Sequence, residues 1–263
     1  MARVGPVDFE DRLTIVEHLD ELRFRIIISL AAFGVAFALC LWQNHLLLDI
    51  ANAPLPNDRD KLLTFGVAEP FTTTLIVSAY GAIIIALPVL LYQLYAYILP
   101  ALSQNEKKVA LPLMLLAPFL FVAGVAFAYF VVLPSATKFL LNFNEDQFNI
   151  QVRARDYYGF MGMTLVSCGV LFQVPIAILA VTRAGIVTTD QLASNRRYAI
   201  LVIAVVAMLL PGTDPVTMLL SMIPLVFLFE GSLILSRFFA PPERVDEEDE
   251  DETGLGITGT RSS

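Results

Sequence analysis

Glu21 is the first carboxylate whose spacing points to a specific interaction. It precedes Arg25 by four residues within residues 17–25, EHLDELRFR, so on a helix the two side chains are neighbours. Such a pair is a surface ion pair that contributes at most a few tenths of a kcal/mol. Leu19 and Leu22 would share one face of the same helix, which predicts an amphipathic segment lying along a membrane surface.

Glu106 occupies the last position of a Ser103-Gln104-Asn105-Glu106 sequence that starts a long apolar run. This spacing is typical of a capping box, in which Ser103 caps the helix and Glu106 accepts from a backbone N–H. A capping glutamate still has a second oxygen that can accept from a ligand. Capping and ligand binding are therefore both compatible with Glu106.

Glu230 and Gln173 are polar side chains inside apolar runs. Ionisable groups in such places are costly and face a polar cavity or a partner, and a buried amide also needs hydrogen-bond partners. Both residues are consistent with hydrogen bonds between helices of this chain. Both are equally consistent with a contact to a partner helix.

Other kinds of chemistry have no support in the sequence. No glycine-rich loop ending in Lys-Ser/Thr follows a strand pattern, and no catalytic triad or paired-carboxylate arrangement can be proposed. His18 and His45 are isolated, and Cys40 and Cys168 lie in apolar runs without metal-ligand spacing. We therefore expect no enzyme activity, no metal, no cofactor and no nucleic-acid partner.

Long apolar runs must position these residues. Of the 263 residues, 57% are hydrophobic and 16% are charged, whereas about 25% are charged in an ordinary soluble domain. A bilayer core needs about 20 apolar helical residues. Four charge-free stretches meet that need, at residues 26–42, 71–99, 109–133 and 157–182.

The C-terminal part predicts two more, shorter helices. Residues 198–210 and 216–235 are apolar and are separated by the turn cluster Pro-Gly-Thr-Asp-Pro at residues 211–215. The simplest interpretation is a short helical hairpin, and the alternative is a re-entrant hairpin that never crosses. We predict an all-α integral membrane protein with six transmembrane helices, the last two short.

Lysine and arginine positions predict the orientation, since cytoplasmic segments carry an excess of both. With the N-terminus inside, twelve of the 17 fall on the cytoplasmic side and five outside. Both termini are then cytoplasmic, and residues 44–70 and 134–156 form structured outer loops. The predicted organisation is an amphipathic segment at 1–25, a membrane domain at 26–238, and a disordered acidic tail at 239–263. The tail holds eight acidic residues and one arginine at residues 243–252.

Short motifs along residues 12–240 resemble the TatC family, the C subunits of twin-arginine translocases. The stretches that carry the resemblance are HLDELRFR at 18–25, APL at 53–55, EPF at 69–71, LLYQLYAYILPAL at 90–102, EKK at 106–108, GVAFAYF at 124–130, QVP at 173–175, RRY at 196–198 and SRF at 236–238.

The resemblance implies a six-span receptor in the bacterial plasma (inner) membrane that binds twin-arginine signal peptides and helps export folded proteins, powered by the proton-motive force. The implied partners are these peptides, single-span subunits of the TatA and TatB type, the bilayer and further copies of the chain. Glu21 and Glu106 match the family's arginine-binding carboxylates, with Arg23 and Tyr97 in the same region. A carboxylate suits this role because guanidinium makes bidentate charge-assisted bonds to it.

Three further positions, Pro54, Asp214 and Gln173, carry over from the family, and Glu230 is a candidate because it lies in an apolar run. Pro54 and Asp214 match functional positions in the outer loops, and Gln173 and Glu230 are the intramembrane polar positions suited to partner contacts. Gln173 stands where the family often has glutamate, and Tyr97 where it often has phenylalanine. Gln173 can therefore form hydrogen bonds but cannot titrate.

Two other functions fit a polytopic protein. A secondary transporter for a small solute is the first, although such proteins show internal repeats and several midplane polar residues that this sequence lacks. An assembly scaffold without a ligand is the second, and it predicts that twin-arginine peptides do not bind.

Overall fold

The computed structural model describes residues 15–55, 62–98, 104–144, 146–148, 150–183, 188–208 and 215–239. Within these residues the regular structure is helical, and the pairing of Leu63 with Arg153 is an isolated β-bridge. The elements are α1 (Ile15–Trp42), α2 (Asn44–Asn52), α3 (Glu69–Ile98), α4 (Gln104–Phe127), the π-helical η2 (Ala128–Val132), α5 (Leu133–Asn142), α6 (Ala154–Leu171), α7 (Val174–Arg183), α8 (Thr189–Ser194), α9 (Arg196–Met208) and α10 (Pro215–Phe239).

Five helical stretches in the described residues are long and apolar enough to cross a membrane. They are His18–Trp42, Glu69–Tyr97, Leu115–Asn142, Ala154–Thr182 and Pro215–Ile234. The predicted all-helical membrane fold is confirmed at this level. Helix α9 has 13 residues and spans about 20 Å, which is shorter than a hydrocarbon core of about 30 Å.

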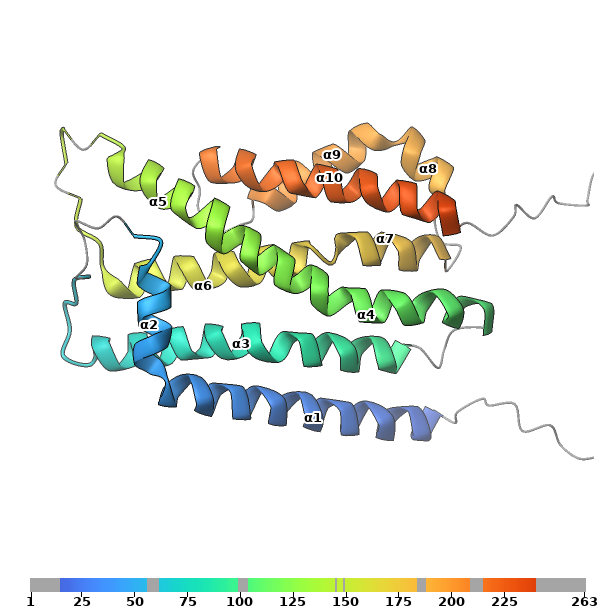
Figure 1. The fold of residues 1–263 in the computed structure, drawn as a ribbon, viewed down its shortest axis with the longest axis horizontal. Helices are drawn as coiled ribbons and strands as arrows, with labels where there is room; N and C mark the ends of the chain where they lie inside the picture. Colours follow the sequence, from blue (N-terminus) through green and yellow to red (C-terminus); the bar gives the residue numbers. More distant parts are fainter. Residues whose placement is uncertain are drawn as a thin grey trace, which may run out of the picture.

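The long helices lie side by side along one axis (Figure 1). Helix α3 is central and packs against α1, α4 and α6, while α10 packs against α7 and α9. Helix α1 begins and α10 ends at the same end of the bundle, here named the termini end. Helix α2 and the starts of α3 and α6 lie at the opposite end, here named the α2 end.

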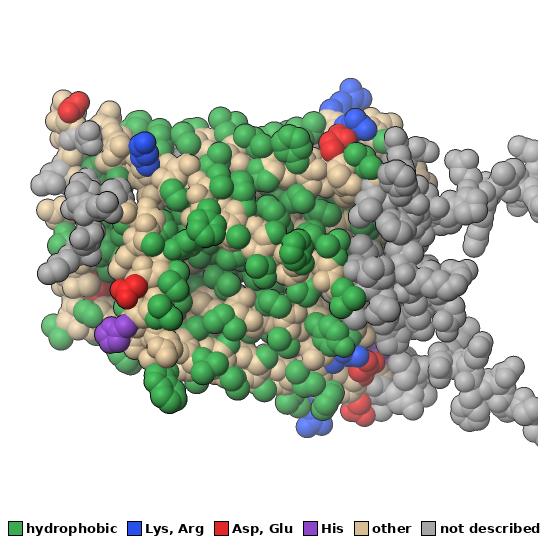
Figure 2. All heavy atoms as spheres, viewed as in Figure 1, with side chains coloured by type: hydrophobic (Ala, Val, Ile, Leu, Met, Phe, Trp, Pro, Cys, Tyr) green, Lys and Arg blue, Asp and Glu red, His purple; other side chains and the backbone are tan. Residues whose placement is uncertain are grey.

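The side of the bundle is apolar. Trp42 is 82% exposed, Phe130 72% and Phe227 74%, and Figure 2 shows hydrophobic side chains across the middle of the molecule with charged side chains near its two ends. Soluble proteins rarely expose contiguous apolar surface of this kind. Lipid chains supply the missing contacts, while the helices satisfy their own backbone groups.

Glycines allow the helices at the centre of the bundle to approach closely. A Cβ on Gly162 would collide with the Tyr80 ring, and one on Gly169 would collide with the Phe121 ring. A Cβ on Gly124 would come within 2.8 Å of the Cys168 backbone oxygen. Small residues at such crossings bring backbones together, which strengthens packing where lipid is as apolar as the core.

The N-terminal segment differs from the prediction. Residues 15–25 are the first turns of α1, which is continuous to Trp42, so they are not a separate helix along the membrane surface. No glycine or proline lies between residues 15 and 33 to end the helix, and adding residues to an existing helix is favourable. The charged side chains instead mark the polar end of the first span.

The boundaries of the third span and its following loop were also predicted wrongly. The helix does not end near residue 133 but continues through η2 and α5 to Asn142. Pro134 has no N–H to donate within an α-helix. Just before it the backbone hydrogen bonds shift to the π-helical pattern, in which the Leu133 N–H donates to the Ala128 carbonyl, five residues back. The loop predicted at 134–156 is therefore shorter, and the loop predicted at 44–70 contains α2.

The two C-terminal helices are not equally short. The prediction holds for α9 but is wrong for α10, which has 25 residues and continues past Glu230 to Phe239. The predicted helix ended at residue 235, just before the charged Arg237, whereas Arg237 lies in the last turns of α10. A single cationic residue there does not end a helix, because positive charge is favourable near a helix C-terminus.

Candidate functional site

Glu21 forms a polar cluster with side chains of α1 and α3 at the termini end. Arg25 donates from Nε to Glu21 Oε1 at 3.0 Å and also donates from Nη2 to the same oxygen. Its Nη1 donates to Gln93 Oε1 at 3.2 Å. The ion pair expected from the spacing is therefore present, and Arg25 also joins α1 to α3. We name His18, Glu21, Arg25, Gln93 and Tyr97 the Glu21 cluster.

An aromatic stack completes the Glu21 cluster. The His18 and Tyr97 rings lie parallel within 13°, with centroids 4.3 Å apart. The His18 Nδ1 atom is 3.9 Å from Glu21 Oε2, beyond hydrogen-bond length. About a quarter of the Glu21 side chain is exposed, so the carboxylate is half-buried and still open to a ligand.

The other residues predicted for this site are placed differently. Arg23 is exposed and forms no ion pair with a described residue. It does not face the same side of α1 as Glu21, because positions two apart on a helix diverge. Glu106 lies in the first turn of α4, which begins at the same end of the bundle as α1 (Figure 1). The side chain of Glu106 lies outside the described residues, as do Ser103 and Asp214.

Gln173 connects two spans at the break between α6 and α7. Its Nε2 donates to the Ala117 backbone oxygen of α4 at 3.0 Å. Its Oε1 is buried and accepts no hydrogen bond from any described residue. A buried acceptor left without a donor costs about 1–3 kcal/mol, which makes this oxygen the open half of the predicted partner contact.

Glu230 has a partner within the chain. Arg196 Nη2 at the start of α9 lies 3.5 Å from Glu230 Oε2 in α10, and both side chains are partly exposed. The pair links the last two helices of the bundle. Glu230 is therefore not an isolated charge, and the structure does not bring it together with Gln173.

Pro54 lies at the α2 end, where hydroxyl groups hold the end of α2. Helix termini leave backbone carbonyls without helical donors. Three tyrosines from η2 and α6, together named the α2 clamp, donate to this end: Tyr129 to Ile50 O (2.8 Å), Tyr157 to Ala51 O (2.9 Å) and Tyr158 to the side-chain oxygen Asn52 Oδ1 (2.8 Å). Thr137 donates to Leu133 O in its own helix at 2.8 Å and lies 3.3 Å from Pro54 O. The clamp holds the residues just before Pro54 against the bundle.

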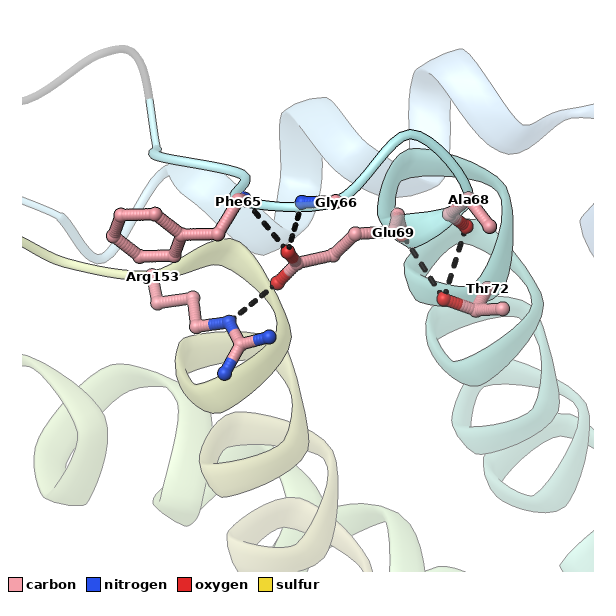
Figure 3. Close-up of polar contacts among 6 residues, drawn as sticks. All are labelled: Phe65, Gly66, Ala68, Glu69, Thr72 and Arg153. Carbon is pink, nitrogen blue, oxygen red and sulfur yellow. Dashed lines mark hydrogen bonds and ion pairs between the residues drawn. The ribbon is translucent and has the colours of Figure 1, made fainter.

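Glu69 forms a second polar cluster, which lies at the α2 end. The sequence pointed to Glu69 only as the first residue of the EPF motif. Its Oε2 accepts from the backbone N–H groups of Phe65 (2.7 Å) and Gly66 (3.2 Å), and its Oε1 accepts from Arg153 Nε at 2.6 Å (Figure 3). The carboxylate raises the pKa of Arg153 above its ordinary value. Leu63 also exchanges backbone hydrogen bonds with Val152 and Ala154. These contacts fasten the loop before α3 to the start of α6.

The part of the chain that the structure describes contains no candidate metal site. No three His, Cys, Asp or Glu side chains there are grouped so as to hold an ion. His18, the histidine nearest a carboxylate, stacks on Tyr97 instead. The polar clusters are therefore suited to hydrogen bonding and ion pairing.

The bundle and its two polar ends define an all-helical integral membrane protein in which Glu21 and Glu69 pair with arginines of the same chain. The family described as Sec-independent protein translocase protein (TatC) matches residues 17–224. The chain belongs to this family, whose members are translocase subunits and not enzymes.

Relatives and solved structures agree with this assignment. The TatC protein of Desulforapulum autotrophicum is 35% identical over 91% of this chain and 90% of its own length. That of Aquifex aeolicus is 35% identical over 86% of this chain and 95% of its own. A crystal structure of the twin-arginine translocase receptor TatC superposes with a TM-score of 0.72 at 35% identity, covering 86% of this chain and all of that one. A structure of the receptor in DDM gives 0.73 at 36% identity, covering 84% and 99%.

Proposed function

We propose that this protein is the receptor and core subunit of a twin-arginine translocase, which binds twin-arginine signal peptides and exports folded proteins. The observation that carries the proposal is the half-buried Glu21 carboxylate, which already pairs with the guanidinium of Arg25. Glu106 lies in the first turn of α4, at the same end of the bundle. The solved structures that the chain resembles are of a twin-arginine translocase receptor. Export is powered by the proton-motive force, so an uncoupler should stop it.

We also propose six spans with both termini in the cytoplasm of a bacterial plasma membrane. The termini end then carries the Glu21 cluster and faces incoming precursors, and the α2 end faces outward. The distribution of lysine and arginine, twelve against five, supports this orientation. Helix α9 is the short fifth span, and its limited length requires local thinning of the bilayer or shielding by α10.

An apolar groove of about 330 Å³ gives the apolar part of a signal peptide a place to bind. It lies between α2, α3, α4, η2 and α6, and its lining includes Leu47, Ile84, Val125, Phe130 and Leu165. An amphipathic or apolar helix binds such a groove through one face. The peptide's arginines would then be held at the Glu21 cluster while its apolar segment extends toward the α2 end.

Gln173 is proposed as a docking point for single-span partners of the TatA and TatB type, in an assembly with further copies of the chain. Its unpaired Oε1 accepts a hydrogen bond from a partner helix, worth about 0.6–2 kcal/mol. Gln173→Leu should therefore weaken partner copurification about three- to thirtyfold. Thr74→Val in α3 is the control, since that hydroxyl donates within its own helix at 2.9 Å. Equal losses in both variants would exclude this docking point. We propose Glu230 only as a secondary contact, because Arg196 already pairs with it.

Direct peptide binding tests the proposed function. The purified protein should bind a twin-arginine signal peptide and should bind a version with two lysines at least about tenfold more weakly, because ammonium groups lack the bidentate fork. Fluorescence anisotropy of labelled peptides in detergent measures both affinities. Equal binding of the two peptides would contradict the proposed recognition of paired arginines. No binding of either peptide would contradict the proposal and favour a scaffold.

A further inference from the structure

The carboxylate of Glu21 is already occupied by a guanidinium of the same chain. Arg25 places both Nε and Nη2 on a single oxygen, Glu21 Oε1. Only Oε2 remains, and the His18 Nδ1 atom is 3.9 Å from it, beyond hydrogen-bond length. An incoming arginine that binds in bidentate fashion needs both carboxylate oxygens. It can obtain them only when Arg25 releases Oε1.

Arg25 has a second anchor that stays in place during such an exchange. Its Nη1 donates to Gln93 Oε1 at 3.2 Å, across the contact between α1 and α3. Gln93 is neutral, so it holds the guanidinium without competing for charge with Glu21. Arg25 can therefore leave the carboxylate by a side-chain rotation and keep a hydrogen bond to α3. Both Glu21 and Arg25 are about a fifth to a quarter exposed, so water is available to the groups that separate.

We propose that Arg25 is an internal competitor that sets the affinity and selectivity of the Glu21 cluster. The inference rests on the proposed function, namely that a paired-guanidinium peptide binds at Glu21. Arg25 imitates one arginine of that peptide and must be displaced by it. A ligand with a lysine pair, or with one arginine, offers too few bonds to displace Arg25, whereas two adjacent arginines offer enough. Arg25 thereby raises the threshold for binding and excludes ordinary basic segments.

Removing the competitor should tighten binding. We expect Arg25→Gln to bind the twin-arginine peptide about two- to fivefold more tightly than the unmodified protein, the range that a partly exposed ion pair provides. Selectivity against the twin-lysine peptide should fall, because a lysine pair no longer has to displace a guanidinium. Arg25→Lys should tighten binding less, since its ammonium makes a single bond to Oε1 but keeps the positive charge.

The experiment measures anisotropy with twin-arginine and twin-lysine peptides on four full-length proteins: the unmodified chain, Arg25→Gln, Arg25→Lys and Arg197→Gln. Arg197 is the control for loss of one positive charge, because it packs over the Tyr198 ring away from Glu21. Tighter binding by both Arg25 variants and an unchanged Arg197→Gln is the expected result. Unchanged or weaker binding by Arg25→Gln, or tightening that Arg25→Lys does not share, would overturn the competitor role. If the unmodified chain fails to prefer the twin-arginine peptide, the proposed function itself fails.

Discussion

Replacing Glu21 and Glu106 together with glutamine should reduce crosslinking of a twin-arginine precursor to background. Glutamine keeps the size of the side chain but removes the charge that a guanidinium needs. Hydrogen bonds to a charged group contribute about 1.5–3 kcal/mol each, so losing both carboxylates should weaken binding by more than about a hundredfold. Photocrosslinking in inverted membrane vesicles, with the precursor in excess, measures the loss.

The neighbouring carboxylate supplies the matched control. Asp20 is exposed on α1 and lies beside Glu21 in the sequence, but it forms no ion pair with a described residue. Asp20→Asn removes the same charge from the same turn and should leave crosslinking unchanged. Undiminished crosslinking in the double glutamine variant would exclude Glu21 and Glu106 as the binding site. So would cysteine labelling that places positions 21 and 106 on opposite sides of the membrane.

The order of the long apolar helices could be predicted because each depends only on local composition. Runs of about 20 residues without charge can lie only across a bilayer or in a large core, and the four long runs all became helices. Helix ends were harder to predict, because charge was taken as the end of a helix. Arg25 and Arg237 both lie inside helices, so a single charge did not end either one.

The polar contacts that build the sites could not be predicted, because they join residues far apart in the sequence. Arg25 and Gln93 are 68 residues apart, Glu69 and Arg153 are 84 apart, and Tyr157 bonds to a carbonyl 106 residues away. No periodicity relates such positions. Glu21 with Arg25 was predictable only because four residues make one helical turn. The rest follows from how α1, α3 and α6 pack.

The α2 clamp could not be predicted either, although its tyrosines lie in or near the family-like motifs. A tyrosine in an apolar run is usually read as part of the core or of an interfacial belt. Tyr157 and Tyr158 are indeed buried, yet the Tyr157 hydroxyl donates to a carbonyl at the end of α2 and the Tyr158 hydroxyl donates to the Asn52 side chain. The clamp holds the end of α2, and Pro54 follows it by two residues.

Removing the three tyrosine hydroxyls of the α2 clamp should release α2 without disturbing the Glu21 cluster. In the triple variant Tyr129→Phe, Tyr157→Phe and Tyr158→Phe the rings still pack, but three hydrogen bonds are lost at about 0.5–1.5 kcal/mol each. The local stability of residues 44–55 should fall by about 1.5–4.5 kcal/mol. Hydrogen–deuterium exchange in nanodiscs should then be faster in α2 by at least about tenfold, with little change in α1 or α3.

The same variant separates peptide binding from a later step of export. The clamp and the Glu21 cluster lie at opposite ends of the bundle, so binding of a twin-arginine peptide should stay within about twofold of the unmodified protein while export of a folded precursor falls. Tyr92→Phe is the control, because this exposed side chain donates to no described residue. Unchanged exchange in residues 44–55 would mean that apolar packing alone holds α2. A parallel loss of peptide binding would mean that the two ends are coupled through α3, since α3 carries Gln93 and Tyr97 at one end and packs against α2 and α6 at the other.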